Sequence, residues 1–262
     1  MGRRSGNRGW IPQQHGAWAM LVAPLLVGLV VRSRDGLPAW ALPLAATWLL
    51  GYFAFNACGL WLKAAPRRRA SHLPALLTWT GLAALAGVAT LLLGGWPLLW
   101  WVPFFCPLLG TALWLTSRRH ERALLSGLCT VLAACLLVPI LEFTTPQAAW
   151  VAWPHPRLAD ALALFGYFFG TVFVVKTLIR ERGKPGWVAA SVGWHAVWVL
   201  LALAGHRHGL AGTAWIVFFV LSTAKAWLLP WIGPRRDRTI RPAQVGLVEI
   251  AFSLAALAIC LW

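Results

Sequence analysis

The chain has 262 residues, of which 60% are hydrophobic and 11% are charged, and its mean hydropathy is +0.69. A soluble domain carries about 25% charged residues, so this chain has too little polar surface to cover a water-facing globule. The composition excludes a soluble enzyme, a secreted disulfide scaffold and a disordered chain. It predicts an all-α polytopic membrane protein.

Nine apolar runs follow one another along the chain, separated by short turns rich in Gly, Pro or Arg. A transmembrane helix needs about 20 apolar residues, whereas the strands of a membrane barrel alternate over about ten, so the run lengths predict helices. No linker interrupts the series, and residues 1–262 are expected to form a single transmembrane domain. The predicted spans are residues 17–31, 38–62, 75–93, 97–116, 123–143, 158–179, 187–204, 213–232 and 243–262.

Lys and Arg number 23 against 7 acidic residues. In a membrane protein such an excess follows the positive-inside rule, so no nucleic-acid partner is predicted. With the N-terminus inside, the cytoplasmic segments hold 17 basic residues and the outside segments hold four, while Lys176 and Lys225 lie within spans. The sequence therefore predicts a cytoplasmic N-terminus and an outside C-terminus.

The bias toward Arg and Trp is typical of a GC-rich bacterial genome, which predicts the bacterial cytoplasmic (inner) membrane.

Polar groups within spans are costly, at about 2.5–3.5 kcal/mol each on insertion scales, so each needs an explanation. In the predicted topology they gather within about 12 Å of the cytoplasmic boundary, at about 1.5 Å per residue. This convergence predicts a cytoplasm-facing polar cavity. The candidate ligand-binding residues are His15, Asn56, Lys176, Arg180, Glu181, His195, Lys225 and Glu249.

The same residues also allow a structural interpretation. Lys225 and Glu249 lie on neighbouring spans and are expected to form a buried ion pair, which serves either structure or function. A lone intramembrane histidine such as His195 is more often a hydrogen-bonded core residue than a ligand or base. Lys176 is able to reach the interface by snorkelling. No catalytic residue is assigned.

No cofactor and no metal site are predicted. A membrane haem needs paired intramembrane histidines, and only His195 lies deep in a span. A Mg²⁺ site needs clustered carboxylates, whereas those of the inner face are widely spaced along the chain. The five cysteines lie in apolar runs without CxxC spacing, which is typical of buried thiols.

Two longer motifs carry a family likeness. The opening stretch Trp10–Met20, with the sequence WIPQQHGAWAM, resembles the start of the YwiC-like family of bacterial integral membrane proteins. Phe169–Gly183 resembles a second hallmark of that family, and Ser191–His195 and Gly246–Ile250 fit it as well. The resemblance covers essentially the whole chain. It implies a multi-pass membrane fold and brings no activity with it.

The predicted architecture is more distantly similar to the UbiA superfamily of intramembrane prenyltransferases, which have nine helices around a cytoplasm-facing cavity. In that family, aspartates after helices 2 and 6 hold Mg²⁺. Here Asn56 is followed by Ala57-Cys58-Gly59-Leu60, and only Glu181 is available in the second region. If the protein is an enzyme, the resemblance implies a UbiA-like transferase that lacks the usual aspartate motifs.

The leading functional hypothesis is a membrane protein that binds an amphipathic or isoprenoid lipid without the usual Mg-diphosphate chemistry. Its partners are then membrane lipids, an isoprenoid or anionic lipid among them, and the sequence does not identify protein partners. Lys176, Arg180 and Lys225 would attract an anionic head. Two alternatives remain open, namely a small-molecule transporter or exporter and a scaffold for a membrane enzyme complex. The low polarity of the outer half argues against the transporter.

Overall fold

The computed structural model of the chain describes residues 9–13, 15–235 and 241–262. Within these ranges the regular secondary structure is entirely helical, with no strand. The helices in chain order are α1 (His15–Ser33), α2 (Ala41–Lys63), α3 (Pro66–Arg69), α4 (Leu73–Gly94), η1 (Trp96–Trp101), α5 (Val102–Ser117), α6 (Leu124–Cys135), α7 (Leu137–Phe143), α8 (Pro146–Val151), α9 (Pro156–Val175), η2 (Lys176–Arg180), α10 (Pro185–Arg207), α11 (Thr213–Arg235) and α12 (Pro242–Leu261).

Nine stretches of the described residues are long and apolar enough to cross a bilayer, which confirms the predicted all-α fold with nine spans. Six of them consist of one helix each, namely α1, α2, α4, α10, α11 and α12. The other three combine η1 with α5, α6 with α7, and α9 with η2. Every predicted span overlaps one of the nine, and the ends differ by at most three residues.

Proline and glycine mark the ends of these spans. Pro156, Pro185 and Pro242 occupy the first position of α9, α10 and α12. Proline suits that position because it lacks the N–H that the first helical turn leaves unpaired. Gly209, between α10 and α11, has a φ of +69°, a left-handed conformation that favours glycine. Between these ends, the backbone N–H and C=O groups pair within the helices, as the hydrocarbon region of a membrane requires.

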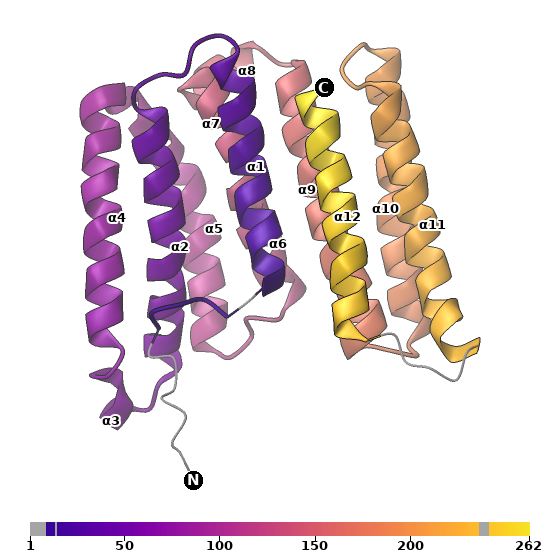
Figure 1. Cartoon of the computed structure of the whole chain (residues 1–262), viewed down its shortest axis with the longest axis horizontal. Coiled ribbons are helices and arrows are strands. Elements are labelled where there is room, and N and C mark those ends of the chain that lie inside the picture. The colour runs from indigo at the N-terminus through magenta and orange to yellow at the C-terminus, as the bar shows by residue number, and fades with distance from the viewer. Residues whose placement is uncertain (1–8, 14, 236–240) are drawn as a thin grey trace.

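The helices form two groups that lie side by side in Figure 1. The N-terminal group comprises α1 to α7, and the C-terminal group comprises α9 to α12. Helix α1 packs against α7 and also against α12, and α6 packs against α9, so these contacts join the groups. An aromatic core fills the C-terminal group, where Tyr167, Phe168 and Phe219 are almost fully buried.

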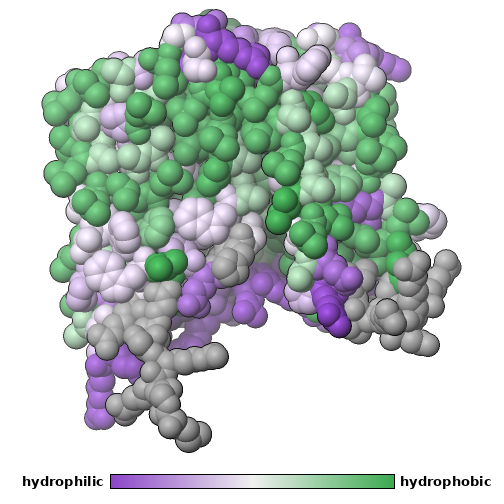
Figure 2. All heavy atoms as spheres, viewed as in Figure 1, coloured by the Kyte–Doolittle hydropathy of each residue, from purple (hydrophilic) through white to green (hydrophobic). Residues whose placement is uncertain are grey.

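Hydrophobic residues form a broad belt across the molecule in Figure 2, with hydrophilic residues above and below it. One end, which we call the basic end, holds α3 and the described N-terminal segment, and the C-terminus lies at the opposite end (Figure 1). Its basic side chains are Lys63, Arg67, Arg68, Arg69, Arg118, Arg119, Arg122, Arg180, Arg182 and Lys184. This arrangement is that of a multi-pass membrane protein.

The orientation of the basic end is testable by thiol labelling of intact cells. A cysteine at Arg68 in α3 is expected to resist an impermeant maleimide, because the positive-inside rule places the basic end in the cytoplasm. A cysteine at Gln147 in α8, at the opposite end, should react. Permeabilised cells control for access, and the wild type controls for the five native cysteines. The reverse labelling pattern would show that the basic end faces outward.

Candidate functional site

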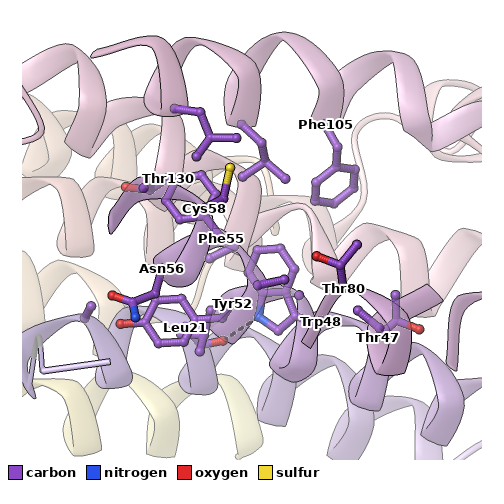
Figure 3. A pocket seen from close by; sticks show the side chains of 18 of the residues that line it. Leu21, Thr47, Trp48, Tyr52, Phe55, Asn56, Cys58, Thr80, Phe105 and Thr130 are labelled. Carbon is purple, nitrogen blue, oxygen red and sulfur yellow. Dashed lines mark hydrogen bonds between the residues drawn. The ribbon is translucent and has the colours of Figure 1, made fainter. Parts of the chain in front are cut away.

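A cavity of about 690 Å³ lies inside the N-terminal group of helices. Its lining comes from α1, α2, α4, η1, α5, α6 and α7, and from Glu121 in the turn between α5 and α6. The walls are mainly aliphatic and aromatic, and Trp48, Tyr52 and Phe105 are among the side chains shown in Figure 3. Small-molecule sites typically have volumes of about 300–1,000 Å³ and mostly apolar walls. The cavity therefore has the size and character of a ligand site.

Helix α2 supplies one continuous wall of this cavity. Its lining residues are 44, 47, 48, 51, 52, 54, 55, 56, 58, 59, 60 and 63, so the open space borders more than one side of the helix. The Trp48 indole N–H donates to the backbone oxygen of Leu21 in α1 at 3.1 Å, drawn as a dashed line in Figure 3. The Tyr52 ring packs edge-on against Trp18, with ring centroids 5.3 Å apart. These contacts hold α1 against the α2 wall.

The lining becomes polar toward the basic end. Lys63, the last residue of α2, pairs with Glu121, and its Nζ lies 3.3 Å from Oε1 of the carboxylate. Asn56 lies two helical turns before Lys63 and is seen at one end of the cavity in Figure 3. Its Nδ2 is buried and has no hydrogen-bond partner among the described residues, and the same holds for Oε2 of Glu121. Asn56 and Glu121 therefore line the cavity with side chains that each keep one polar atom without a partner among the described residues.

Glu121 lies outside the membrane-spanning segments, and its ionisation follows from its neighbours. Burial raises the pKa of its carboxyl group, but the nearby backbone N–H of Glu121 and the Lys63 ammonium outweigh that effect. The net result is a pKa below the usual value for glutamate. The Glu121 carboxylate is thus negatively charged at neutral pH and balances the positive charge of Lys63.

The described part of the N-terminal segment covers the same end of α2 and α4. Gly9 has a φ of +97°, and a side chain there would come within 3.4 Å of Ala57, so the backbone approaches α2 closely. Trp10 packs edge-on against Trp79 of α4. His15 is the first residue of α1, and its side chain lies outside the described part of the structure. Its predicted role as a ligand-binding residue stays a prediction.

Lys225 and Glu249 form the predicted ion pair, in the C-terminal group. Nζ of Lys225 lies 2.7 Å from Oε1 of Glu249, and the two side chains are 5% and 14% exposed. The Tyr167 hydroxyl from α9 lies 3.2 Å from the other carboxylate oxygen and 3.1 Å from the hydroxyl of Ser253. Nζ of Lys225 also sits over the ring of Phe252, 4.1 Å from its centroid. This cluster ties α9, α11 and α12 together.

His195 is fully buried in α10, next to the same cluster. Its Nδ1 lies 2.7 Å from the backbone oxygen of Ser191, so Nδ1 carries a proton and donates it. Its Nε2 faces Gly170 of α9, where an added Cβ would come within 2.6 Å. Nε2 has no hydrogen-bond partner among the described residues. His195 therefore occupies the contact between α9 and α10 as a packed core residue.

The remaining candidates lie at and just beyond the inner end of α9. Lys176 begins the π-helical turn η2, is 9% exposed, and places Nζ over the ring of Trp187 at 4.9 Å. Arg180 ends that turn, within electrostatic reach of Glu121. Glu181 follows it and pairs with Lys184 at 2.7 Å, and this hydrogen bond lowers the pKa of the Glu181 carboxyl.

The structure thus separates the predicted residues. Lys176, Arg180 and Glu181 lie at the inner end of α9, and the side chain of His15 lies outside the described part. Among the seven whose side chains the structure describes, only Asn56 lines the 690 Å³ cavity. Lys225, Glu249 and His195 lie together in the packed C-terminal group instead. The sequence reasoning left out Lys63 and Glu121 as lining residues. The spacing of seven residues between Asn56 and Lys63, two turns on one helical face, was the available signal for Lys63.

Comparison with known proteins agrees with the family likeness. The model of the YwiC-like protein family matches residues 11–142. The uncharacterized protein YwiC of Bacillus subtilis (strain 168) is 30% identical over 261 residues, covering 96% of this chain and 97% of the relative. An uncharacterized protein of Haemophilus influenzae is 25% identical over 254 residues, covering 93% of each chain.

No solved structure matches the chain, and the more distant likeness to the UbiA superfamily stays a prediction. The family model covers half of the chain, and the alignment with the Bacillus relative runs over nearly all of both proteins. The nine spans are in keeping with the membrane fold that the motifs implied. The chain is a member of the YwiC-like protein family.

Proposed function

We propose that the protein binds an amphipathic lipid, with an isoprenoid or acyl chain inside the 690 Å³ cavity and the head group at its polar end. The observation that carries this proposal is the change of character along the cavity. Leu98, Trp101 and Ile140 line its apolar part, whereas Lys63 and Glu121 line the end that reaches the membrane boundary. This gradient matches the two parts of an amphipathic lipid.

The proposed setting is the cytoplasmic membrane of a bacterium, with the basic end in the cytoplasm. The relatives in Bacillus and Haemophilus support a bacterial protein. The concentration of arginine and lysine at one end supports the orientation. A lipid would then enter the cavity from the membrane and present its head to the cytoplasmic side.

Binding is proposed without Mg²⁺-dependent ionisation of a diphosphate. Intramembrane prenyltransferases hold Mg²⁺ through aspartates, whereas Ala57 and Leu60 stand after Asn56 here and offer no ligand for a hard cation. Across the described residues, no group of three or more His, Cys, Asp or Glu side chains lies close enough to share a metal ion. The donor set of this site therefore suits a lipid held by packing and hydrogen bonds.

The proposal is tested by filling the cavity. Ala83 of α4 lines it, so Ala83→Trp should occupy the space of the lipid chain and reduce the bound lipid at least tenfold. Ala84 is exposed on the same helix and does not line the cavity, which makes Ala84→Trp a matched control. The measurement is native mass spectrometry of protein purified in mild detergent, followed by lipid extraction and identification.

A retained lipid that survives in Ala84→Trp and is lost in Ala83→Trp supports the proposal. Equal retention in both variants, or none in the wild type, would contradict it. Reconstituted vesicles then separate the two alternatives. A flux of small solutes that Ala83→Trp blocks would indicate a transporter. The absence of any flux would favour the scaffold for a membrane enzyme complex.

A further inference from the structure

The polar end of the cavity also restricts which lipid head it accepts. We infer that the head is uncharged and carries both a hydrogen-bond acceptor and a hydroxyl donor, as a glycerol, sugar or hydroxylated ring does. This inference rests on the proposed function, because it names the substrate class of the same cavity.

The first argument is charge balance. Among the described residues that line the cavity, only Lys63 and Glu121 carry charge, and their atoms Nζ and Oε1 are 3.3 Å apart. The pair is neutral as a whole. A phosphate or diphosphate head would either separate the two partners or remain without a full counter-charge. Both outcomes are unfavourable in a partly buried site, where charges are poorly solvated.

The second argument is the pair of free hydrogen-bonding atoms. Nδ2 of Asn56 is a donor and Oε2 of Glu121 is an acceptor, and each is buried without a partner among the described residues. Buried polar atoms are normally satisfied, so two such atoms in one cavity lining indicate a ligand that completes them. The ligand needs an oxygen that accepts from Asn56 and a hydroxyl that donates to Glu121.

The third argument is spacing. Asn56 and Lys63 are seven residues apart on α2, which is about 10 Å along the helix. Glu121 is held beside Lys63 by their ion pair. A single hydroxyl does not extend from the Asn56 amide to the Glu121 carboxylate. A head with several oxygens on a short carbon frame covers more of that distance. This favours a polyhydroxylated or ring-bearing head over a simple alcohol.

Apart from Lys63, no basic side chain among the described residues lines the cavity. Arg122 and Arg180 lie within electrostatic reach of Glu121 but outside the lining. Lys225 pairs with Glu249 in the other group of helices, and Lys176 sits on Trp187. Arg119 lies beyond Lys63, where its guanidinium donates to the Lys63 backbone oxygen at 3.4 Å. Attraction of anions is therefore a property of the surrounding basic end.

The test compares two lipids that differ only in a phosphate. Monooleoylglycerol and oleoyl lysophosphatidic acid share the chain and the glycerol, and their binding to the purified full-length protein is measured by thermophoresis at 150 mM salt. The wild type is expected to bind monooleoylglycerol at least tenfold more tightly. Asn56→Leu should weaken that binding about fivefold or more, because it removes the free donor.

Glu121→Gln gives the sharper outcome. Removing the carboxylate leaves Lys63 without its counter-charge, so the preference should move at least tenfold toward the phosphate lipid. Glu181→Gln is the matched control, because it removes the same charge from the basic end at a pair with Lys184 outside the cavity. It should leave the preference unchanged.

The outcomes separate this inference from the proposed function. Tighter binding of the phosphate lipid by the wild type, lost in Ala83→Trp, would overturn the uncharged head and leave lipid binding intact. A preference that moves equally in Glu121→Gln and Glu181→Gln would also overturn it, because the effect would then come from overall charge. Binding of neither lipid, with no lipid retained in the wild type on purification, would overturn both.

Discussion

Replacing Lys225 with methionine is expected to lower the free energy of unfolding by about 3–5 kcal/mol. The substitution leaves the Glu249 carboxylate in the packed C-terminal group without the ammonium that now lies 2.7 Å away. Both side chains are largely buried, so water does not replace the missing partner. Glu249→Met should cost a similar amount, since it leaves the Lys225 ammonium unpaired. Equilibrium unfolding in mixed micelles, followed by circular dichroism, measures both losses.

The double variant of Lys225 and Glu249 should recover much of the loss, because no unpaired charge remains. In the double variant the Tyr167 hydroxyl keeps two hydrogen-bond partners. The backbone oxygen of residue 249 lies 3.0 Å from it and the Ser253 hydroxyl lies 3.1 Å from it. Lys184→Met, which breaks an exposed pair with Glu181, is the control and should change stability little. Additive losses in the double variant would show that Lys225 and Glu249 do not act as a pair.

The spans and the Lys225–Glu249 pair were predictable because both depend on position along the membrane normal. Hydrophobic run length fixes which residues cross the bilayer, and counting residues from each boundary gives their depth. Lys225 and Glu249 have similar depths on consecutive spans, and consecutive spans pack together in this structure. Depth and neighbourhood together were sufficient to predict that contact.

The separation of the candidate residues across the bundle was not predictable from depth. Asn56 and His195 have similar depths, but α2 and α10 belong to different groups of helices, and only Asn56 lines the cavity. The lateral position of a helix within the bundle depends on which helix faces pack together. Apolar residues cover most faces of these helices, so the sequence does not show which face meets which neighbour. Glu121 was hidden for a related reason, because the turn after α5 folds back toward Lys63 through a long-range contact.

Two identical triplets illustrate how differently the two groups of helices pack. Gly51-Tyr52-Phe53 lies in α2 and Gly166-Tyr167-Phe168 lies in α9. Tyr52 lines the cavity, whereas Tyr167 is fully buried and hydrogen-bonded to Glu249. The same Gly-Tyr pair therefore borders open space in one group and close packing in the other.

Gly166→Ala is accordingly expected to destabilise the protein by about 1–3 kcal/mol, as overpacking of a filled core does. A Cβ at Gly166 would come within 2.2 Å of the Trp198 ring, which is stacked on Phe219, so the ring would have to shift. At Gly51 an added Cβ meets no atom within 4 Å, so Gly51→Ala should stabilise α2 by up to about 1 kcal/mol through helix propensity alone. Thermal unfolding of both variants in the same detergent measures the difference. A stabilising shift in Gly166→Ala would mean that α9 and α10 do not pack as closely as the structure shows, and a destabilising shift in Gly51→Ala would mean that α2 has no open space at Gly51.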